Sequence, residues 1–152
     1  MNYGFVKVAA AVPHVRVADC FYNTQQIEGM MRQAATKHVQ IIAFPELSIT
    51  AYTCLDLFQQ ETLLRYAEKA LMELVSKTAD LDLLTIVGCP LRSGSQLINA
   101  AVAFQRGEIL GVVPKSYLPS YKEFQEERWF TPESQLQEGV IQISGRAVPM
   151  DS

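Results

Sequence analysis

Two charged residues occupy equivalent places in this sequence, each directly after an apolar run that ends in proline. Glu46 follows one such run and Pro45, and Lys115 follows another and Pro114. In open α/β sheets, functional residues gather at the carboxyl ends of strands. There a carboxylate can act as a general base and an ammonium can stabilise a developing oxyanion. Simpler roles are also open, a turn or helix-capping carboxylate for Glu46 and a solvent-reaching surface lysine for Lys115.

Covalent chemistry with such a pair needs a nucleophile, and cysteine is the obvious candidate. The three cysteines, Cys20, Cys54 and Cys89, are widely spaced and form no CxxC pair. Cys89 lies at a predicted strand end where buried cysteine is common, and Cys54 is expected to pack in the core. Cys20 opens a predicted helix, where the pKa of a thiol can be lowered. The pattern favours none of the three as a nucleophile and indicates no metal site.

The elements that would hold these residues alternate between strands and helices. Apolar runs predict strands near 4–12, 40–44, 83–88, 96–105 and 108–114, and helical spacing predicts helices over 19–37 and 61–79. Asp19 is a candidate N-cap, and Gly107 can take the positive φ of a tight hairpin turn. This order predicts an α/β fold with parallel strands, both helices on one face of the sheet and an antiparallel portion. We expect the first strand to be mostly buried and the apolar stretch from about Gly139 to be an unfinished strand.

Composition sets the broad class of the protein. The 152 residues are enough for one domain with a sizeable core, with 49% hydrophobic and 19% charged residues. A net charge of −3 lacks the positive charge that is typical of nucleic-acid binding. No apolar run approaches the roughly 20 residues of a membrane span. The cysteine usage and the lack of a signal-peptide layout predict a cytoplasmic protein.

Two longer motifs carry a family resemblance. "FPELSITAY" and "KSYLPSYKEFQEERWF" resemble the first two motif regions of the nitrilase, or carbon–nitrogen hydrolase, superfamily. The second string, together with "AYTCLDLF", is most similar to the N-terminal glutaminase domain of glutamine-dependent NAD⁺ synthetases. The resemblance extends over nearly the whole chain. It implies a nitrilase-like α-β-β-α sandwich, of which this sequence would be the N-terminal part only.

The resemblance also implies roles for particular residues. Glu46 matches the general base and Lys115 the oxyanion-stabilising lysine, while Tyr52, Tyr121 and Phe124 match the lining of the glutamine pocket. The family's nucleophilic cysteine would lie on a later strand, beyond residue 152. We therefore expect residues 1–152 to be the N-terminal portion of an amidase domain that binds glutamine and joins a homo-oligomer. These residues would need no cofactor, whereas ATP and Mg²⁺ would serve a synthetase domain absent from this chain.

Two other functions stay open. The chain could belong to another branch of the superfamily that acts on an aliphatic amide, a nitrile or a carbamoyl compound. Alternatively, it could be a non-catalytic structural or assembly fragment, because no cysteine is correctly placed. Glu46 and Lys115 should converge within a few ångströms in a cleft. The resemblance to the glutaminase domain implies that Phe124 walls one side of the amide pocket, whereas another branch would leave residues 117–130 without a specific purpose. Without the thiol, we expect the isolated chain to have no measurable glutaminase activity.

Overall fold

The structure, a computed structural model, describes residues 3–136 and 139–151. Its main element is a five-stranded mixed sheet in the order β1-β2-β3-β4-β5. The strands are β1 (Val8–Ala10), β2 (Ile41–Ala43), β3 (Leu84–Ser93), β4 (Gln96–Gln105) and β5 (Glu108–Pro114). β1, β2 and β3 pair in parallel, and β3, β4 and β5 pair antiparallel. The predicted α/β order and the hairpin of the last two strands are confirmed, and Gly107 takes a φ of +80° in the turn.

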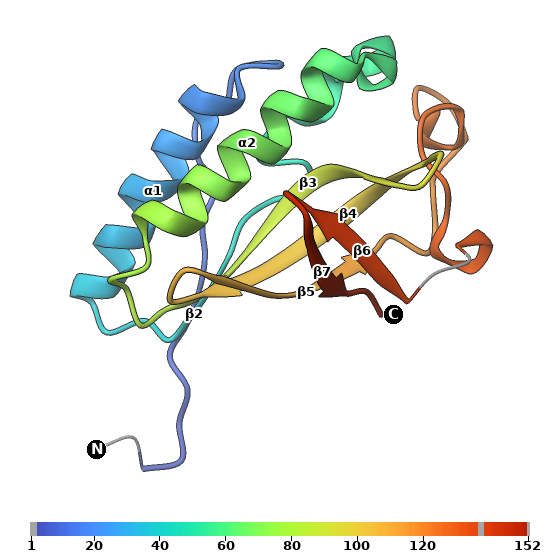
Figure 1. Ribbon diagram of the computed structural model, residues 1–152. Coiled ribbons are helices and arrows are strands. Elements are labelled where there is room, and N and C mark those ends of the chain that lie inside the picture. The colour runs from blue at the N-terminus through green and yellow to red at the C-terminus, as the bar shows by residue number, and fades with distance from the viewer. Residues whose placement is uncertain (1–2, 137–138, 152) are drawn as a thin grey trace.

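Two helices lie side by side over one face of this sheet (Figure 1). α1 (Cys20–Thr36) begins after Asp19, whose side chain accepts a hydrogen bond from the Tyr22 backbone N–H at 3.2 Å. α2 (Glu61–Lys77) carries the apolar stripe that the helical spacing predicted, and its residues on that stripe are buried. The core is formed between helices and sheet, with these fully buried side chains among its members: Ile27, Met31, Leu71, Leu74, Val87, Val102 and Phe104.

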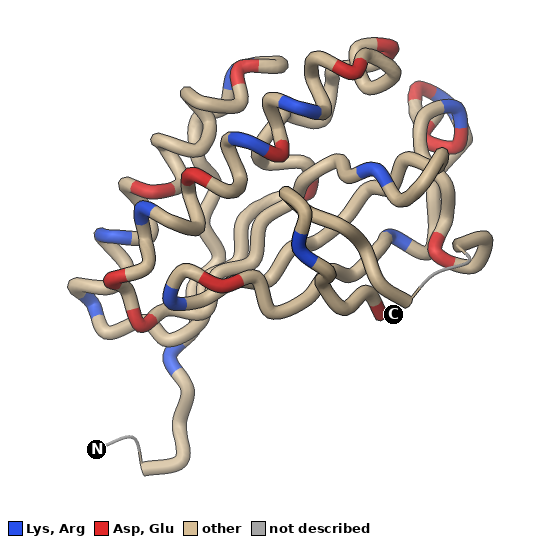
Figure 2. Tube along the Cα trace, in the orientation of Figure 1, with Lys and Arg blue, Asp and Glu red and all other residues tan. Residues whose placement is uncertain are grey.

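Charged residues occupy the outer sides of the helices. Figure 2 shows acidic and basic residues interspersed along both helices rather than gathered by sign. Several form exposed ion pairs, such as Arg32 with Glu28 and with Asp80. Exposed pairs of this kind contribute little to stability, so the packed apolar face holds the helices in place.

Two predicted strand boundaries are wrong. The first strand was expected over 4–12 and mostly buried, but β1 has three residues and Val8 is 65% exposed. Among the strands of residues 3–136 and 139–151, β1 lies at the edge of the sheet and pairs with β2 alone, which an apolar sequence does not reveal. The third strand was expected to end at residue 88 but continues to Ser93. It runs through Pro90 because β2 pairs with β3 only as far as Ile86, and proline is tolerated on an unpaired edge.

The expected unfinished strand near the end of the sequence is instead a complete hairpin. β6 (Val140–Ile143) and β7 (Arg146–Pro149) form a separate two-stranded antiparallel sheet. Ser144 and Gly145 both take positive φ in the connecting turn. The hairpin packs its buried side chains into the main core, and the Ser144 backbone N–H donates to the Glu68 carboxylate of α2.

The remaining segments are short 3₁₀ turns within loops. They are η1 (Tyr52–Gln59), η2 (Glu126–Arg128) and η3 (Glu133–Gln135). η2 lies inside the long loop of residues 116–132, which is rich in aromatic residues. None of the helices in the described parts of the chain has the length and hydropathy of a membrane-spanning segment.

Candidate active site

Glu46 lies on a tight turn at the carboxyl end of β2. The strand ends as the Phe44 N–H donates to the Ile86 carbonyl at 2.9 Å, and Pro45 then begins the turn. Leu47 is fully buried and takes a φ of +51°, a conformation that costs a non-glycine residue energy. The turn therefore fixes the backbone on both sides of Glu46.

Gly88 on β3 allows this turn to pack directly against the sheet. A side-chain carbon at Gly88 would overlap the backbone of residues 45–47. The Gly88 N–H donates to Ser48 Oγ at 3.1 Å, and its carbonyl accepts from the Ile49 N–H at 3.1 Å. The turn that presents Glu46 is thus anchored to β3 by two hydrogen bonds and by close backbone contact.

Lys115 immediately follows β5 and reaches Glu46. The Lys115 N–H donates to the Asn99 carbonyl on β4 at 2.8 Å, which fixes the start of the loop. The Lys115 Nζ lies 2.7 Å from Glu46 Oε1, so the predicted convergence of the two side chains is confirmed. The pair is only partly enclosed, because the side chains of Lys115 and Glu46 are 29% and 39% exposed.

A second carboxylate also contacts the ammonium of Lys115. The sequence did not identify it as a site residue. Glu126 of η2 is buried, and both of its oxygens lie 3.0 Å from Lys115 Nζ. The Tyr52 hydroxyl donates to Glu126 Oε1 at 2.7 Å. In the sequence Glu126 is one of several acids in an aromatic loop, and no spacing distinguishes it from Glu123 or Glu127.

Asn99 is a further residue that sequence reasoning missed. It is buried near the middle of β4, and its Nδ2 donates to Glu46 Oε1. The available signal was a polar residue in an otherwise apolar run of β4. Buried polar groups need partners, so such a residue points to a hydrogen-bonded site.

The contacts shift the ionisation of two groups. Burial alone would lower the pKa of Lys115, but hydrogen bonds to Glu46 and Glu126 outweigh it and raise that pKa. Burial, followed by the hydrogen bond to Glu126, raises the pKa of Tyr52. At neutral pH the site therefore presents an ammonium between two carboxyl groups, with a neutral phenol behind the second.

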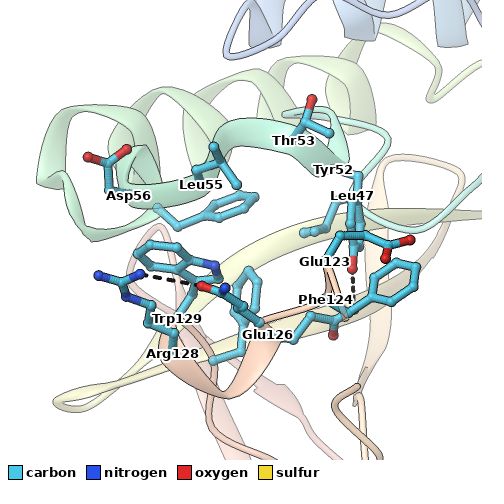
Figure 3. Close-up of a pocket in the computed structure, with 13 residues that line it drawn as sticks. Leu47, Tyr52, Thr53, Leu55, Asp56, Glu123, Phe124, Glu126, Arg128 and Trp129 are labelled. Atoms are coloured by element: carbon cyan, nitrogen blue, oxygen red, sulfur yellow. Dashed lines mark hydrogen bonds between the residues drawn. The ribbon is translucent and has the colours of Figure 1, made fainter. Parts of the chain in front are cut away.

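A pocket of about 610 Å³ adjoins this cluster (Figure 3). Residues of η1 form one wall, and residues 123–126 and 128–130 form the opposite wall. Tyr52 and Phe124 both line it, with their rings edge to face at 6.4 Å between centroids. Tyr121 does not line the pocket. It is 63% exposed and contacts Phe124 from outside, at 5.8 Å between ring centroids.

A second cavity, of about 330 Å³, also adjoins the charged cluster. Glu46, Asn99 and Lys115 line it, together with apolar residues of β3, β4 and β5. Glu126 lines the larger pocket and contacts Lys115 of the smaller one. The ammonium of Lys115 is therefore held where the two cavities approach each other.

None of the three cysteines is hydrogen-bonded to this cluster in the described structure. All three are buried, and burial raises the pKa of each thiol above its ordinary value, that of Cys20 to about 12. The lowered pKa considered for Cys20 is therefore wrong, because burial dominates over its place at a helix start. Cys54 donates to the Thr50 carbonyl at 3.1 Å, as a packed core residue does.

Across 3–136 and 139–151, no group of three or more His, Cys, Asp and Glu side chains is arranged to hold a metal ion. The site brings together the partly exposed carboxylate of Glu46, the ammonium of Lys115 and the buried carboxylate of Glu126. Such a set suits attack by a nucleophile on an amide or nitrile carbon.

Comparison with known protein families shows which family the chain belongs to. The model of the carbon-nitrogen hydrolase family matches residues 7–148. The chain belongs to the carbon-nitrogen hydrolase (nitrilase) family. This confirms the resemblance drawn from the motifs around Glu46 and Lys115.

Within this family, the chain is similar to glutamine-dependent NAD(+) synthetases. The chain is 40% identical to the glutamine-dependent NAD(+) synthetase of Mycobacterium tuberculosis H37Rv over 147 residues, 97% of this chain and 22% of that enzyme. It is 37% identical to the synthetase of Aquifex aeolicus over 133 residues, 87% of this chain and 23% of that enzyme. The chain thus spans about a fifth of the length of these relatives.

Solved structures show the same fold. A glutamine-dependent NAD(+) synthetase from Cytophaga hutchinsonii matches with a TM-score of 0.88 at 23% identity, covering 95% of this chain and 25% of that one. An amidase from Nesterenkonia matches with a TM-score of 0.70 at 20% identity, covering 93% of this chain and 53% of that one. The mixed α/β fold of a nitrilase-family protein, over part of its length, is therefore shown.

Proposed function

We propose that this chain forms part of the glutamine-hydrolysing site of a glutamine-dependent NAD⁺ synthetase. The main support for this proposal is the position of Lys115, which is held between Glu46 and Glu126 beside a pocket lined by Tyr52 and Phe124. The names of the relatives with 37–40% identity support the choice of glutamine as the amide. The ammonia would then serve the ATP-dependent amidation of deamido-NAD⁺ elsewhere in the enzyme.

We assign each of these residues a step. Glu46 would take the proton of a cysteine thiol that lies outside residues 1–152, and the thiolate sulfur would attack the amide carbon of glutamine. The Lys115 ammonium would donate a hydrogen bond to the oxygen as it becomes an oxyanion. Collapse breaks the C–N bond, and the proton on Glu46 passes to the leaving nitrogen, which departs as ammonia. Glu46 then takes a proton from water as the water oxygen attacks the thioester carbon. The C–S bond breaks, and Glu46 returns the proton to the departing sulfur, which gives glutamate and the free thiol.

Glu126 would keep Lys115 in position through this cycle. Two oxygens at 3.0 Å hold the ammonium, and the hydrogen bond from Tyr52 fixes the carboxylate itself. A buried carboxylate next to a lysine keeps the lysine charged, which an oxyanion stabiliser requires. Tyr52 would in addition form the substrate pocket with Phe124, with Tyr121 supporting Phe124 from outside.

A chimera tests this proposal. The chain would replace the aligned 147 residues of the M. tuberculosis synthetase, and NAD⁺ formation would be measured with glutamine and separately with ammonia. We expect both nitrogen sources to work, and Glu46→Gln to reduce only the glutamine-driven rate, by about 10²–10⁴-fold. A chimera that uses ammonia but hydrolyses an aliphatic amide in place of glutamine would contradict the proposal and favour another branch of the family.

A further inference from the structure

Asn99 is the least exposed polar residue in contact with Glu46, and the proposed catalytic steps give it no role. It is 3% exposed, whereas the Glu46 side chain is 39% exposed. Its Nδ2 donates to Glu46 Oε1, and its carbonyl accepts from the Lys115 N–H at 2.8 Å. One residue of β4 is thereby bonded to both charged partners, which come from different strand ends.

The hydrogen bonds to Glu46 converge on one of its two oxygens. Oε1 accepts from Asn99 Nδ2 and also from Lys115 Nζ at 2.7 Å. Within the described residues no protein donor reaches Oε2. A carboxylate oxygen with two donors has its in-plane lone pairs occupied, so the other oxygen is the one free to accept a proton.

We propose that Asn99 is a positioning residue that selects Glu46 Oε2 as the proton-accepting atom and aligns it with Lys115. This proposal rests on the proposed function of Glu46 as the general base, and it specifies which of the two carboxylate oxygens accepts the proton. A half-exposed carboxylate without this bond would sample several rotamers and present either oxygen. Small displacements of a base are costly, since a misplacement of about 1 Å can reduce a rate by about 10²-fold.

A purely structural role for Asn99 is the competing explanation, since buried asparagines often only satisfy backbone groups. Asn23 offers a matched control, because it is fully buried and its amide is bonded to the carbonyls of Arg16 and Ile49. Substituting Asn23 removes buried hydrogen bonds without touching a charged group of the site.

NMR on this chain separates the two explanations. The Asn99 side-chain amide resonances of the wild-type protein should shift in Glu46→Gln, because the acceptor of their hydrogen bond has changed. The side-chain amide resonances of Asn23 should not shift. This measurement needs no variant of Asn99 to fold, and an Asn99 amide that ignores Glu46 would overturn the proposal.

The titration of Lys115 gives a second readout. Its ammonium faces Glu46 and Glu126, and Tyr52 is bonded to Glu126. Asn99→Ala should loosen Glu46 and lower the pKa of Lys115, whereas Asn99→Asp adds a negative charge and should raise it. Asn23→Ala should leave it unchanged. Folded Asn99 variants in which Lys115 titrates as in the wild type would contradict the proposal.

The chimera with the synthetase adds the kinetic test. Asn99→Ala should lower kcat for glutamine hydrolysis by about 10²-fold, leave KM for glutamine nearly unchanged and leave ammonia-driven synthesis unaffected. An active chimera in which Asn99→Ala keeps the full kcat would overturn the role of Asn99 while the proposed function stands. A chimera without glutaminase activity would count against the proposed function, and the NMR experiments would still decide the role of Asn99.

Discussion

The buried carboxylate of Glu126 lies 3.0 Å from Lys115 Nζ through each of its two oxygens. Glu46 contacts the same ammonium through one oxygen and is far more exposed. The two carboxylates are therefore not equivalent. Glu126 is suited to holding the lysine, and Glu46 remains accessible for proton transfer.

This difference predicts unequal effects on stability. Glu126→Gln keeps the shape of the side chain but removes the charge that satisfies Lys115, and should lower the free energy of unfolding by about 1–3 kcal/mol. Glu46→Gln, the matched control, should change it by about 0.5 kcal/mol or less, because water can replace a partly exposed partner. Urea denaturation measures both. An equal or larger loss for Glu46→Gln would show that Glu126 is not the structural anchor.

Phe124 should affect substrate binding and not the later use of ammonia. In the chimera, Phe124→Ala removes a ring from the wall of the 610 Å³ pocket and should raise KM for glutamine. NAD⁺ formation from ammonia should be unchanged. Tyr121→Ala, which alters a neighbouring ring outside the pocket, should have the smaller effect. If Phe124→Ala reduces both activities equally, the loop is a folding element and does not define the pocket.

The buried thiols make stability depend on alkaline pH. Burial raises the pKa of Cys20 from 9.0 to about 12, so above pH 9.0 the unfolded chain loses this proton before the folded chain does. The free energy of unfolding should therefore fall as pH rises from 9.0 to about 12, by up to about 1.4 kcal/mol per pH unit for this group. Urea midpoints between about pH 8 and about pH 10.5 should show a shallower decline in Cys20→Ala. The control Ile27→Val should lower stability without changing the slope, and an unchanged slope in Cys20→Ala would contradict the assignment.

The chain of residues 1–152 alone should release no measurable ammonia from glutamine. Glu46 and Lys115 are in place, but the three thiols are buried and lie in the core rather than at the pair. Acid–base assistance alone contributes about 10²–10⁴-fold, well below the roughly 10⁶-fold or more of a working enzyme. Ammonia release that disappears in Cys54→Ala or Cys89→Ala would identify a nucleophile within this chain and refute this prediction.

The sequence predicted the parts of the site that follow from strand periodicity. Glu46 and Lys115 each come after an apolar run and a proline, so their meeting at one edge of the sheet could be anticipated. Glu126 could not be found this way, because its hydrogen-bond partner Tyr52 lies 74 positions away in the sequence. A loop has no period that indicates which of its acidic residues faces inward.

Local sequence patterns also do not carry the information that would have prevented the errors in the predicted fold. The apolar residues near Val8 predicted a buried strand, but position at a sheet edge is decided by strand order, which local sequence does not carry. The hairpin of β6 and β7 depends on positive φ at Ser144, a residue type that rarely indicates such a turn. Helix boundaries were predicted closely because Asp19 and the apolar stripe of α2 are local signals.

Ammonia release from glutamine by the chimera, measured for Glu46→Gln, Lys115→Met and the double variant, tests most directly whether this pair is the catalytic unit. A base and an oxyanion stabiliser that act together should be non-additive. Each single variant should lose about 10²-fold or more, and the double variant should be little worse than the poorer single variant. All variants should retain synthesis from added ammonia. Single variants that keep more than about a tenth of the glutaminase rate, or a double variant whose loss is the product of the two single losses, would contradict a joint catalytic role for Glu46 and Lys115.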